Sequence, residues 1–139
     1  MMDLVSKLGR KAKRRLSKEY FVWLTTVSSD LTPQPRPVWF ILQDNSFLIF
    51  SQPHTHKVRH LTQHPKVALH FNADETGDND ILVFTGSATI DSQIPPAHRL
   101  PAYFRKYRVG IAGLGMTPAE FSADYSVAIR ITPTSWRGV

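Results

Sequence analysis

The chain has 139 residues, the size of one domain with a hydrophobic core of its own. It contains no cysteine, which excludes thiol catalysis, disulfide bonds and thiolate metal sites. The net charge of +6 permits an anionic partner, and no apolar run is as long as a membrane span or a signal peptide. The absence of cysteine leads us to expect a cytoplasmic protein.

A basic helix and three strands are predicted first along the chain. Residues 1–18 alternate apolar and cationic side chains with the spacing of an amphipathic helix. Aromatic and β-branched residues predict a strand over 20–27. Turn-forming residues then separate two further strands, over 34–42 and 46–51, which predicts an antiparallel meander.

The middle of the chain predicts a short helix and two more strands. The helix opens near Lys57 and is closed by Pro65, because proline cannot continue it. Strands follow over 66–72 and 81–90, separated by an acidic loop, and Gly86 within the second strand indicates a bulge or bend.

The last third returns to helical spacing before one final strand. Residues 95–115 are predicted to be helical, with a buried face made of Tyr103, Phe104, Tyr107 and Ile111. The segment 117–120 has the composition of a capping box with proline at the first helical position, so a second short helix begins there. The final strand is predicted over 126–132.

These elements predict a mainly β protein that forms a single domain over residues 1–139. Six strands joined mostly by short turns favour a small antiparallel β-barrel with peripheral helices.

The junction between the strand 46–51 and the next helix predicts an anion site. Backbone N–H groups at a helix start are unpaired and favour a negative charge. Ser51, Gln52 and Lys57 add a hydroxyl, an amide and a cation at that place. We expect a phosphate there, carried by a cofactor.

Several short motifs follow one another along nearly the whole chain. They are Trp23-Leu24-Thr25-Thr26-Val27, residues 33–40, Ser51-Gln52-Pro53 followed by Lys57-Val58-Arg59, Gly86-Ser87-Ala88, Gly115-Met116-Thr117-Pro118 and residues 132–137. In this order and spacing they resemble the flavin-binding split-barrel family that includes the pyridoxamine 5′-phosphate oxidases. The pattern most resembles the branch of deazaflavin (coenzyme F-420) dependent oxidoreductases.

The resemblance implies a homodimeric oxidoreductase with a split β-barrel fold. Its cofactor, deazaflavin F-420 or FMN, would lie at the dimer interface and exchange hydride with an unknown small molecule. The residues that it assigns to the cofactor are Arg36, Pro37, Val38, Trp39 and Trp136 for the ring and Ser51, Gln52 and Lys57 for the phosphate. Trp39 and Trp136 are also compatible with ordinary core or interface positions. No catalytic residue is assigned.

Two departures from the family pattern argue against a pyridoxamine 5′-phosphate oxidase proper. Gln43 stands where those enzymes carry a further lysine, and the C-terminal arginine and histidine that bind their substrate phosphate have no clear counterpart.

Other functions remain open at this point. The protein could be a non-enzymatic FMN- or haem-binding protein, or a basic nucleic-acid-binding module, although no aromatic residues interleave with the N-terminal cations to stack on bases. The basic helix could bind the polyglutamate tail of a deazaflavin or be simply solvated. His56, His60 and His64 share a helix face, but no nearby carboxylate completes a metal site, so we predict no metal.

Overall fold

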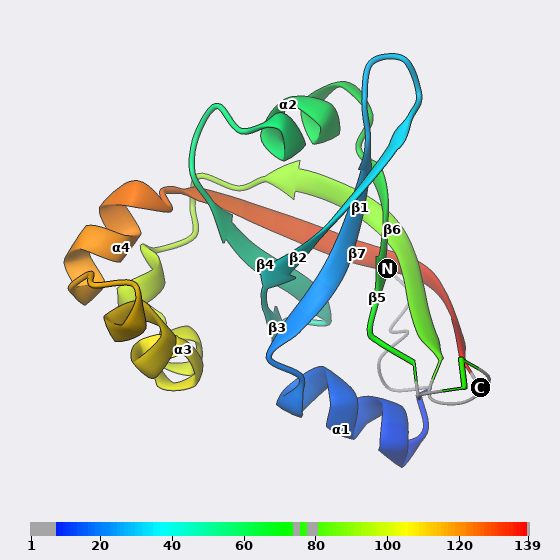
Figure 1. Ribbon diagram of the computed structural model, residues 1–139, viewed down its shortest axis with the longest axis horizontal. Coiled ribbons are helices and arrows are strands. Elements are labelled where there is room, and N and C mark those ends of the chain that lie inside the picture. The colour runs from blue at the N-terminus through cyan, green and yellow to red at the C-terminus, as the bar shows by residue number, and fades with distance from the viewer. Residues whose placement is uncertain (1–7, 74–75, 78–80, 139) are drawn as a thin grey trace.

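The computed structural model describes residues 8–73, 76–77 and 81–138, and in that part of the chain it contains seven strands and four α-helices (Figure 1). Residues 1–7 of the predicted N-terminal helix and part of the predicted loop 73–80 lie outside the described residues. The elements are α1 (Arg10–Lys18), β1 (Phe21–Val27), β2 (Pro33–Trp39), β3 (Ile41–Gln43), β4 (Ser46–Ser51), α2 (His56–Gln63), β5 (Lys66–His70), β6 (Leu82–Ile90), a 3-10 turn η2 (Ala97–Arg99), α3 (Pro101–Gly113), α4 (Pro118–Asp124) and β7 (Val127–Gly138).

The strands form one antiparallel sheet that curls on itself. Its strand order is β2-β1-β5-β6-β7-β4-β3, so the two outermost strands follow each other directly in the chain. Only Phe40 separates them, and the two ends of the sheet therefore meet at this residue. The predicted antiparallel split barrel with peripheral helices is confirmed. The single strand predicted over 34–42 is divided into β2 and β3, which gives seven strands in the described chain instead of six.

The division at Phe40 is stabilised by one tyrosine from α3. The Phe40 N–H donates to the Tyr107 hydroxyl at 2.8 Å. That hydroxyl directs its proton towards the carbonyl oxygens of Tyr20, at 2.6 Å, and Phe40, at 2.9 Å. Lys106 adds a hydrogen bond from Nζ to the Phe40 carbonyl at 3.0 Å. The backbone groups that leave the ladder here therefore gain side-chain partners, as buried polar groups require.

Two apolar clusters lie on opposite faces of β4, which is buried at every position. Successive strand residues point to opposite faces, so Phe47 and Ile49 enter the barrel core while Leu48 and Phe50 face α3 and α4. This explains the continuous apolar run in that strand. From α3, Tyr103, Tyr107 and Ile111 are buried as predicted, whereas Phe104 is only half-buried.

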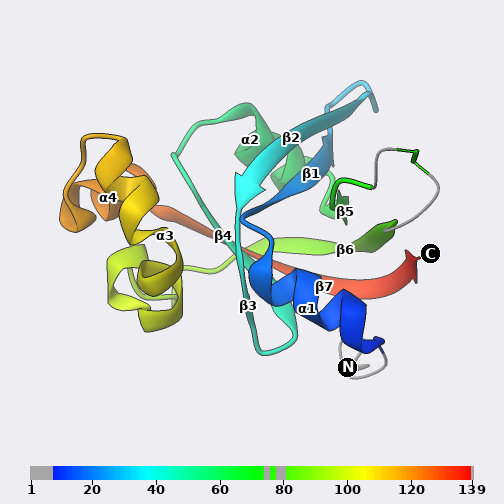
Figure 2. The same ribbon diagram turned by 60° about the horizontal axis from the view of Figure 1, so that its bottom comes forward.

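The helices occupy different parts of the barrel surface. Figures 1 and 2 place α1 and α2 at opposite ends of the barrel, with α3 and α4 together at one side. The predicted capping box opens α4: Thr117 Oγ1 accepts from the Glu120 N–H at 3.1 Å, and the Glu120 carboxylate accepts from the Thr117 N–H at 2.9 Å. Among the described helices, none combines the length and the apolar composition needed to cross a bilayer.

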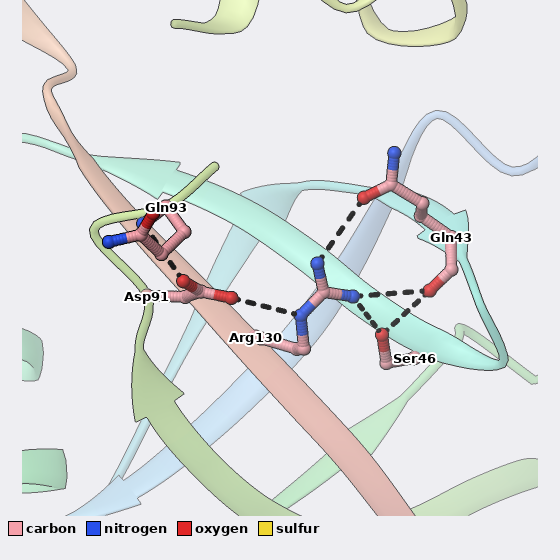
Figure 3. A network of polar contacts seen from close by, with 5 residues as sticks. All are labelled: Gln43, Ser46, Asp91, Gln93 and Arg130. Carbon is pink, nitrogen blue, oxygen red and sulfur yellow. Dashed lines mark hydrogen bonds and ion pairs between the residues drawn. The ribbon is translucent and has the colours of Figure 1, made fainter. Parts of the chain in front are cut away.

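Arg130 on β7 ties three segments together at the end of the β3–β4 hairpin (Figure 3). Its guanidinium donates to the Ser46 hydroxyl at 2.7 Å and to the backbone and side-chain oxygens of Gln43 at 3.3 Å. On the other side it lies 3.5 Å from the Asp91 carboxylate, which also accepts from the Gln93 N–H at 3.0 Å. We call this set of residues the Arg130 clasp.

Candidate functional site

A pocket of 210 Å³ opens between β2, α2 and the α3–α4 pair. We call it the aromatic pocket, because its walls include Trp39, Phe50, Tyr103, Phe121 and Tyr125. The apolar face of β4 and the buried faces of α3 and α4 supply most of these rings, so the packing that builds the second apolar cluster also builds the pocket.

The aromatic pocket brings together two segments that the sequence had assigned to a cofactor. Arg36, Pro37, Val38 and Trp39 line it from β2, and Lys57 lines it from the first turn of α2. The strand β2 contains three prolines and lies at one end of the strand order, where prolines are tolerated. Its outer side therefore carries backbone groups with no strand neighbour in the described sheet.

Lys57 is the most unusual residue of this pocket. Its exposed fraction is 8%, and within the described residues its ammonium group has no hydrogen-bond or ion-pair partner. Burial, reinforced by the nearby positive charge of Arg36, lowers the pKa of Lys57 to about 8. A buried cation beside a second cation is costly unless an anion joins them. We call Lys57 and Arg36 the cation pair.

Ser51 and Gln52, the other predicted phosphate ligands, have protein partners. The fully buried Ser51 hydroxyl donates to the Gln52 carbonyl at 2.9 Å and lies 3.3 Å from the hydroxyl of Thr55, which caps α2. The Gln52 amide donates to the Asp124 carboxylate at 2.8 Å. Both side chains thus order the loop that presents Lys57, and their direct contact with a phosphate stays a prediction.

Trp136 lies apart from the other predicted residues. It is 37% exposed on β7 and lines a separate pocket of 190 Å³ with Lys11 and Arg15 of α1. Within one chain the structure does not bring its indole to the aromatic pocket.

Trp39 acts as a wall of the aromatic pocket. Its indole stacks on the Tyr107 ring with centroids 4.6 Å apart and an interplanar angle of 7°. At least one face of the indole is therefore covered by the protein itself. The rings of Phe121 and Tyr125 stack in the same way, 4.4 Å apart, and continue the flat lining of the pocket.

A second pocket, of 410 Å³, shares the cation pair with the aromatic pocket. We call it the polar pocket; besides Arg36 and Lys57 it is lined by Thr26, Gln34, Pro35, His56 and His60. Among these residues, the sequence pointed only to His56 and His60, and only as candidate metal ligands. The contribution of α3 and α4 to the aromatic pocket was not predicted. The regular spacing of the two histidines on one helix face was the only local signal.

The histidines of α2 already have partners in the protein. His60 Nδ1 lies 3.1 Å from the Thr26 hydroxyl, and His56 Nδ1 lies 2.9 Å from the Arg59 guanidinium. In the described part of the chain, no group of three or more histidine or acidic side chains is placed to bind a metal ion. Helix α1, which carries most of the cations of the predicted basic helix, lies at the opposite end of the barrel from α2 (Figure 2).

The aromatic pocket and the cation pair together suit a flat heterocycle that carries an anionic group. Flat aromatic walls contact a planar ring over a large area, and two cations bind a phosphate through charge-assisted hydrogen bonds. Burial raises the pKa of Tyr103, so its hydroxyl remains a neutral hydrogen-bond donor at the pocket wall.

Comparisons with known proteins agree with this architecture. The model of the pyridoxamine 5′-phosphate oxidase family matches residues 8–139. Similar solved structures include an F420 reductase, with 23% identity over 94% of this chain and 98% of that chain and a TM-score of 0.71. Another is the haem storage protein HutZ from Vibrio cholerae, with 16% identity, 94% of each chain covered and a TM-score of 0.65.

A FAD-binding protein from Mesorhizobium loti is similar over 91% of this chain and 87% of that chain, with 13% identity and a TM-score of 0.63. No curated protein matches the chain in sequence. At these identities the solved structures support the fold alone, whereas the family model spans almost the whole chain. This chain therefore belongs to the pyridoxamine 5′-phosphate oxidase family.

Proposed function

We propose that this protein is an oxidoreductase that uses a flavin-type cofactor, deazaflavin F-420 or FMN, to exchange hydride with a small molecule. The observation that carries the proposal is the buried ammonium of Lys57, which has no partner among the described residues and lies beside Arg36 at the edge of the aromatic pocket. A cofactor phosphate would neutralise this pair, and its ring would fill the pocket. Membership of the family and the likeness to an F420 reductase and a FAD-binding protein point in the same direction.

The residues present fit such a cofactor. Lys57 and Arg36 would hold the anion, and the segment Pro37–Trp39 would lie along the ring with its unpaired backbone edge. Tyr103, Phe121 and Tyr125 would exclude water from the other side. When bound, the cofactor supplies two-electron hydride chemistry, so the protein needs to orient it and keep the site dry.

We also propose that the working form is a homodimer that closes the aromatic pocket. Leu114 lines this pocket although its side chain is 53% exposed. An apolar rim left open to water favours coverage by another surface, and a second copy of the chain would provide it.

Titration of the purified protein with FMN and with oxidised F-420 tests the proposed function. Replacing Lys57 with methionine keeps the length and apolar stem of the side chain but removes its charge. We expect the dissociation constant of the cofactor to rise about 10- to 100-fold, because one charge-assisted hydrogen bond is lost. Lys18→Met, on the exposed surface of α1, is the matched control and should bind like the wild type.

Absorption spectra recorded during these titrations, and during a titration with haem, distinguish the proposed function from haem storage. Haem storage is the alternative to test because one similar structure is a haem storage protein. A haem-binding protein would develop a Soret band with haem and leave the flavin spectra unchanged. Equal flavin affinities of the wild type and Lys57→Met would remove the site assignment.

A further inference from the structure

The polar pocket and the aromatic pocket are neighbours, and the cation pair lies at their shared border. Arg36 and Lys57 line both pockets, so an anion held between these two cations would lie at the border of both. On one side of the anion is the aromatic pocket, and on the other is the polar pocket with its volume of 410 Å³.

Sheet register explains why β1 and β2 present polar groups to this pocket. Thr26 pairs with Gln34 and Leu24 pairs with Arg36, and directly opposed residues of antiparallel strands point to the same face. Leu24 and Thr26 point inward, at exposed fractions of 0% and 1%. Gln34 and Arg36 therefore share the inward face at the end of the β1–β2 hairpin, where α2 packs against β1.

His56 offers a hydrogen-bond donor to the polar pocket. Its Nδ1 lies 2.9 Å from the Arg59 guanidinium. A guanidinium can only donate, so His56 Nδ1 must be the unprotonated acceptor. The neutral ring consequently carries its proton on Nε2, which has no partner within the described residues.

The lining of the polar pocket is strongly biased towards donors. It contains an ammonium, a guanidinium, the His56 N–H and the Gln34 amide, and no carboxylate among its described lining residues. The complementary ligand is a chain rich in oxygen acceptors with negative charge. An apolar or cationic chain would leave these donors unsatisfied.

We propose that the cofactor does not end at the anion held by Lys57 and Arg36 but continues into the polar pocket with a second anionic group. This inference rests on the proposed function and specifies the class of cofactor. Two sources share the required chemistry: the second phosphate of a flavin dinucleotide, and the carboxylates of a glutamyl tail on a deazaflavin.

The test compares ligands that share a ring and differ in their tail. FMN is compared with FAD, and F-420 without glutamate is compared with its glutamylated form, by fluorescence titration of the full chain. We expect the tailed member of at least one pair to bind about tenfold more tightly than its tailless partner. The pair that shows this advantage identifies the source of the second anion.

A double variant, Gln34→Ala with His56→Ala, assigns the effect to the polar pocket. It should abolish the advantage of the tailed ligand while changing the affinity for the tailless one less than about twofold. Retained tailless binding also shows that the variant is folded. His64→Ala is the matched histidine control, because His64 follows the last turn of α2 and does not line the pocket.

The outcomes separate the two proposals. Equal affinities within both ligand pairs would overturn the tail site and leave the flavin-type cofactor in place. An advantage that survives in the double variant would also overturn it. If none of the four ligands bound to the wild type, the proposed function itself would fall, and this inference with it.

Discussion

The charged side chain of Lys57 lowers the stability of the folded protein but favours the binding of an anionic ligand. Its ammonium is buried without a partner in the described structure, and its pKa falls to about 8 because charge is disfavoured there. In the unfolded chain the pKa returns to its ordinary value of 10.5. Between about pH 8 and 10.5 the unfolded state therefore binds more protons, and the free energy of unfolding contributed by Lys57 rises with pH through that window.

Anion binding has the opposite pH dependence. An anion between Lys57 and Arg36 favours the charged lysine and raises its pKa, so the complex takes up a proton wherever the free lysine has lost one. We expect FMN affinity to be constant from about pH 7 to 7.5 and to fall above pH 8, by up to about tenfold per pH unit. Dissociation constants measured from pH 7 to 10 give this profile.

Lys57→Arg is the control for this titration, because a guanidinium stays protonated throughout the range. Its affinity should vary much less with pH than that of the wild type. A flat wild-type profile would show that Lys57 does not contact the anion.

Two buried tyrosines, one turn apart on α3, provide a matched comparison. The Tyr107 hydroxyl accepts from the Phe40 N–H, whereas the Tyr103 hydroxyl has no hydrogen-bond partner within the described residues. Tyr107→Phe should reduce the free energy of unfolding by about 1–3 kcal/mol, because it orphans a buried N–H. Tyr103→Phe should change it by less than about 1 kcal/mol. Urea unfolding of both variants measures the difference, and equal losses would contradict the role of Tyr107.

The Arg130 clasp fixes the β3–β4 hairpin to the rest of the barrel. Arg130→Met keeps the apolar stem but removes the contacts with Gln43, Ser46 and Asp91 shown in Figure 3. We expect a loss of about 1–3 kcal/mol in the free energy of unfolding, because the Ser46 and Gln43 oxygens lose a charged donor.

Flavin binding provides the control for the clasp. Arg130 lines neither the aromatic nor the polar pocket, so the affinity of Arg130→Met for FMN should match that of the wild type below its unfolding transition. A variant that is equally stable but binds more weakly would show that the clasp acts on the site.

Elements specified by local chemistry were predictable from the sequence. The Thr117–Glu120 capping box forms as expected, and the sheet register shifts between Thr85 and Gly86, where a bulge was predicted. The break at Phe40 was not predictable, because it depends on Tyr107, which comes from a distant helix. Similarly, the last strand was predicted over 126–132, but β7 continues to Gly138. Pro133 pairs with Gly86 at that bulge, where a missing N–H is tolerated.

The sequence predicted those parts of the site whose residues are close together in the chain, at one strand-to-helix junction or along one strand. Lys57 and the segment Arg36–Trp39 fall in the same pocket because α2 packs against β1, the strand that pairs with β2. The roles of Ser51 and Gln52 could not be foreseen, since their partners include Asp124, which only the folded chain brings near. The polar pocket depends on the register of β1 and β2, which the sequence alone does not fix.

The proposed dimer has a candidate face on the outside of the sheet. A hollow of 610 Å³ there is lined by apolar and small residues, among them Val27, Ala68 and Gly86, together with threonines, Ser87 and Lys66. Ala68 points outward, because its neighbours Val67 and Leu69 are buried in the barrel core. A second copy covering this face would bury apolar surface, the main driving force of stable association.

Light scattering should give a mass of twice 15.8 kDa for the wild type. Ala68→Glu should shift the protein to monomer and weaken FMN binding about tenfold or more, because the aromatic pocket would stay open. Gln63→Glu adds the same charge at an exposed position of α2 and should remain dimeric. A dimeric Ala68→Glu variant would place the interface elsewhere, and a monomeric wild type would exclude the dimer.

The prolines of β2 have a consequence for how the protein behaves at high concentration. Pro33, Pro35 and Pro37 pair with alternate residues of β1, so the missing N–H groups all lie on the side away from β1. An incoming chain would find almost no amide hydrogens along this stretch, and it could not extend the sheet into an aggregate. The same three residues thus guard the protein against fibril growth while leaving their carbonyl oxygens free.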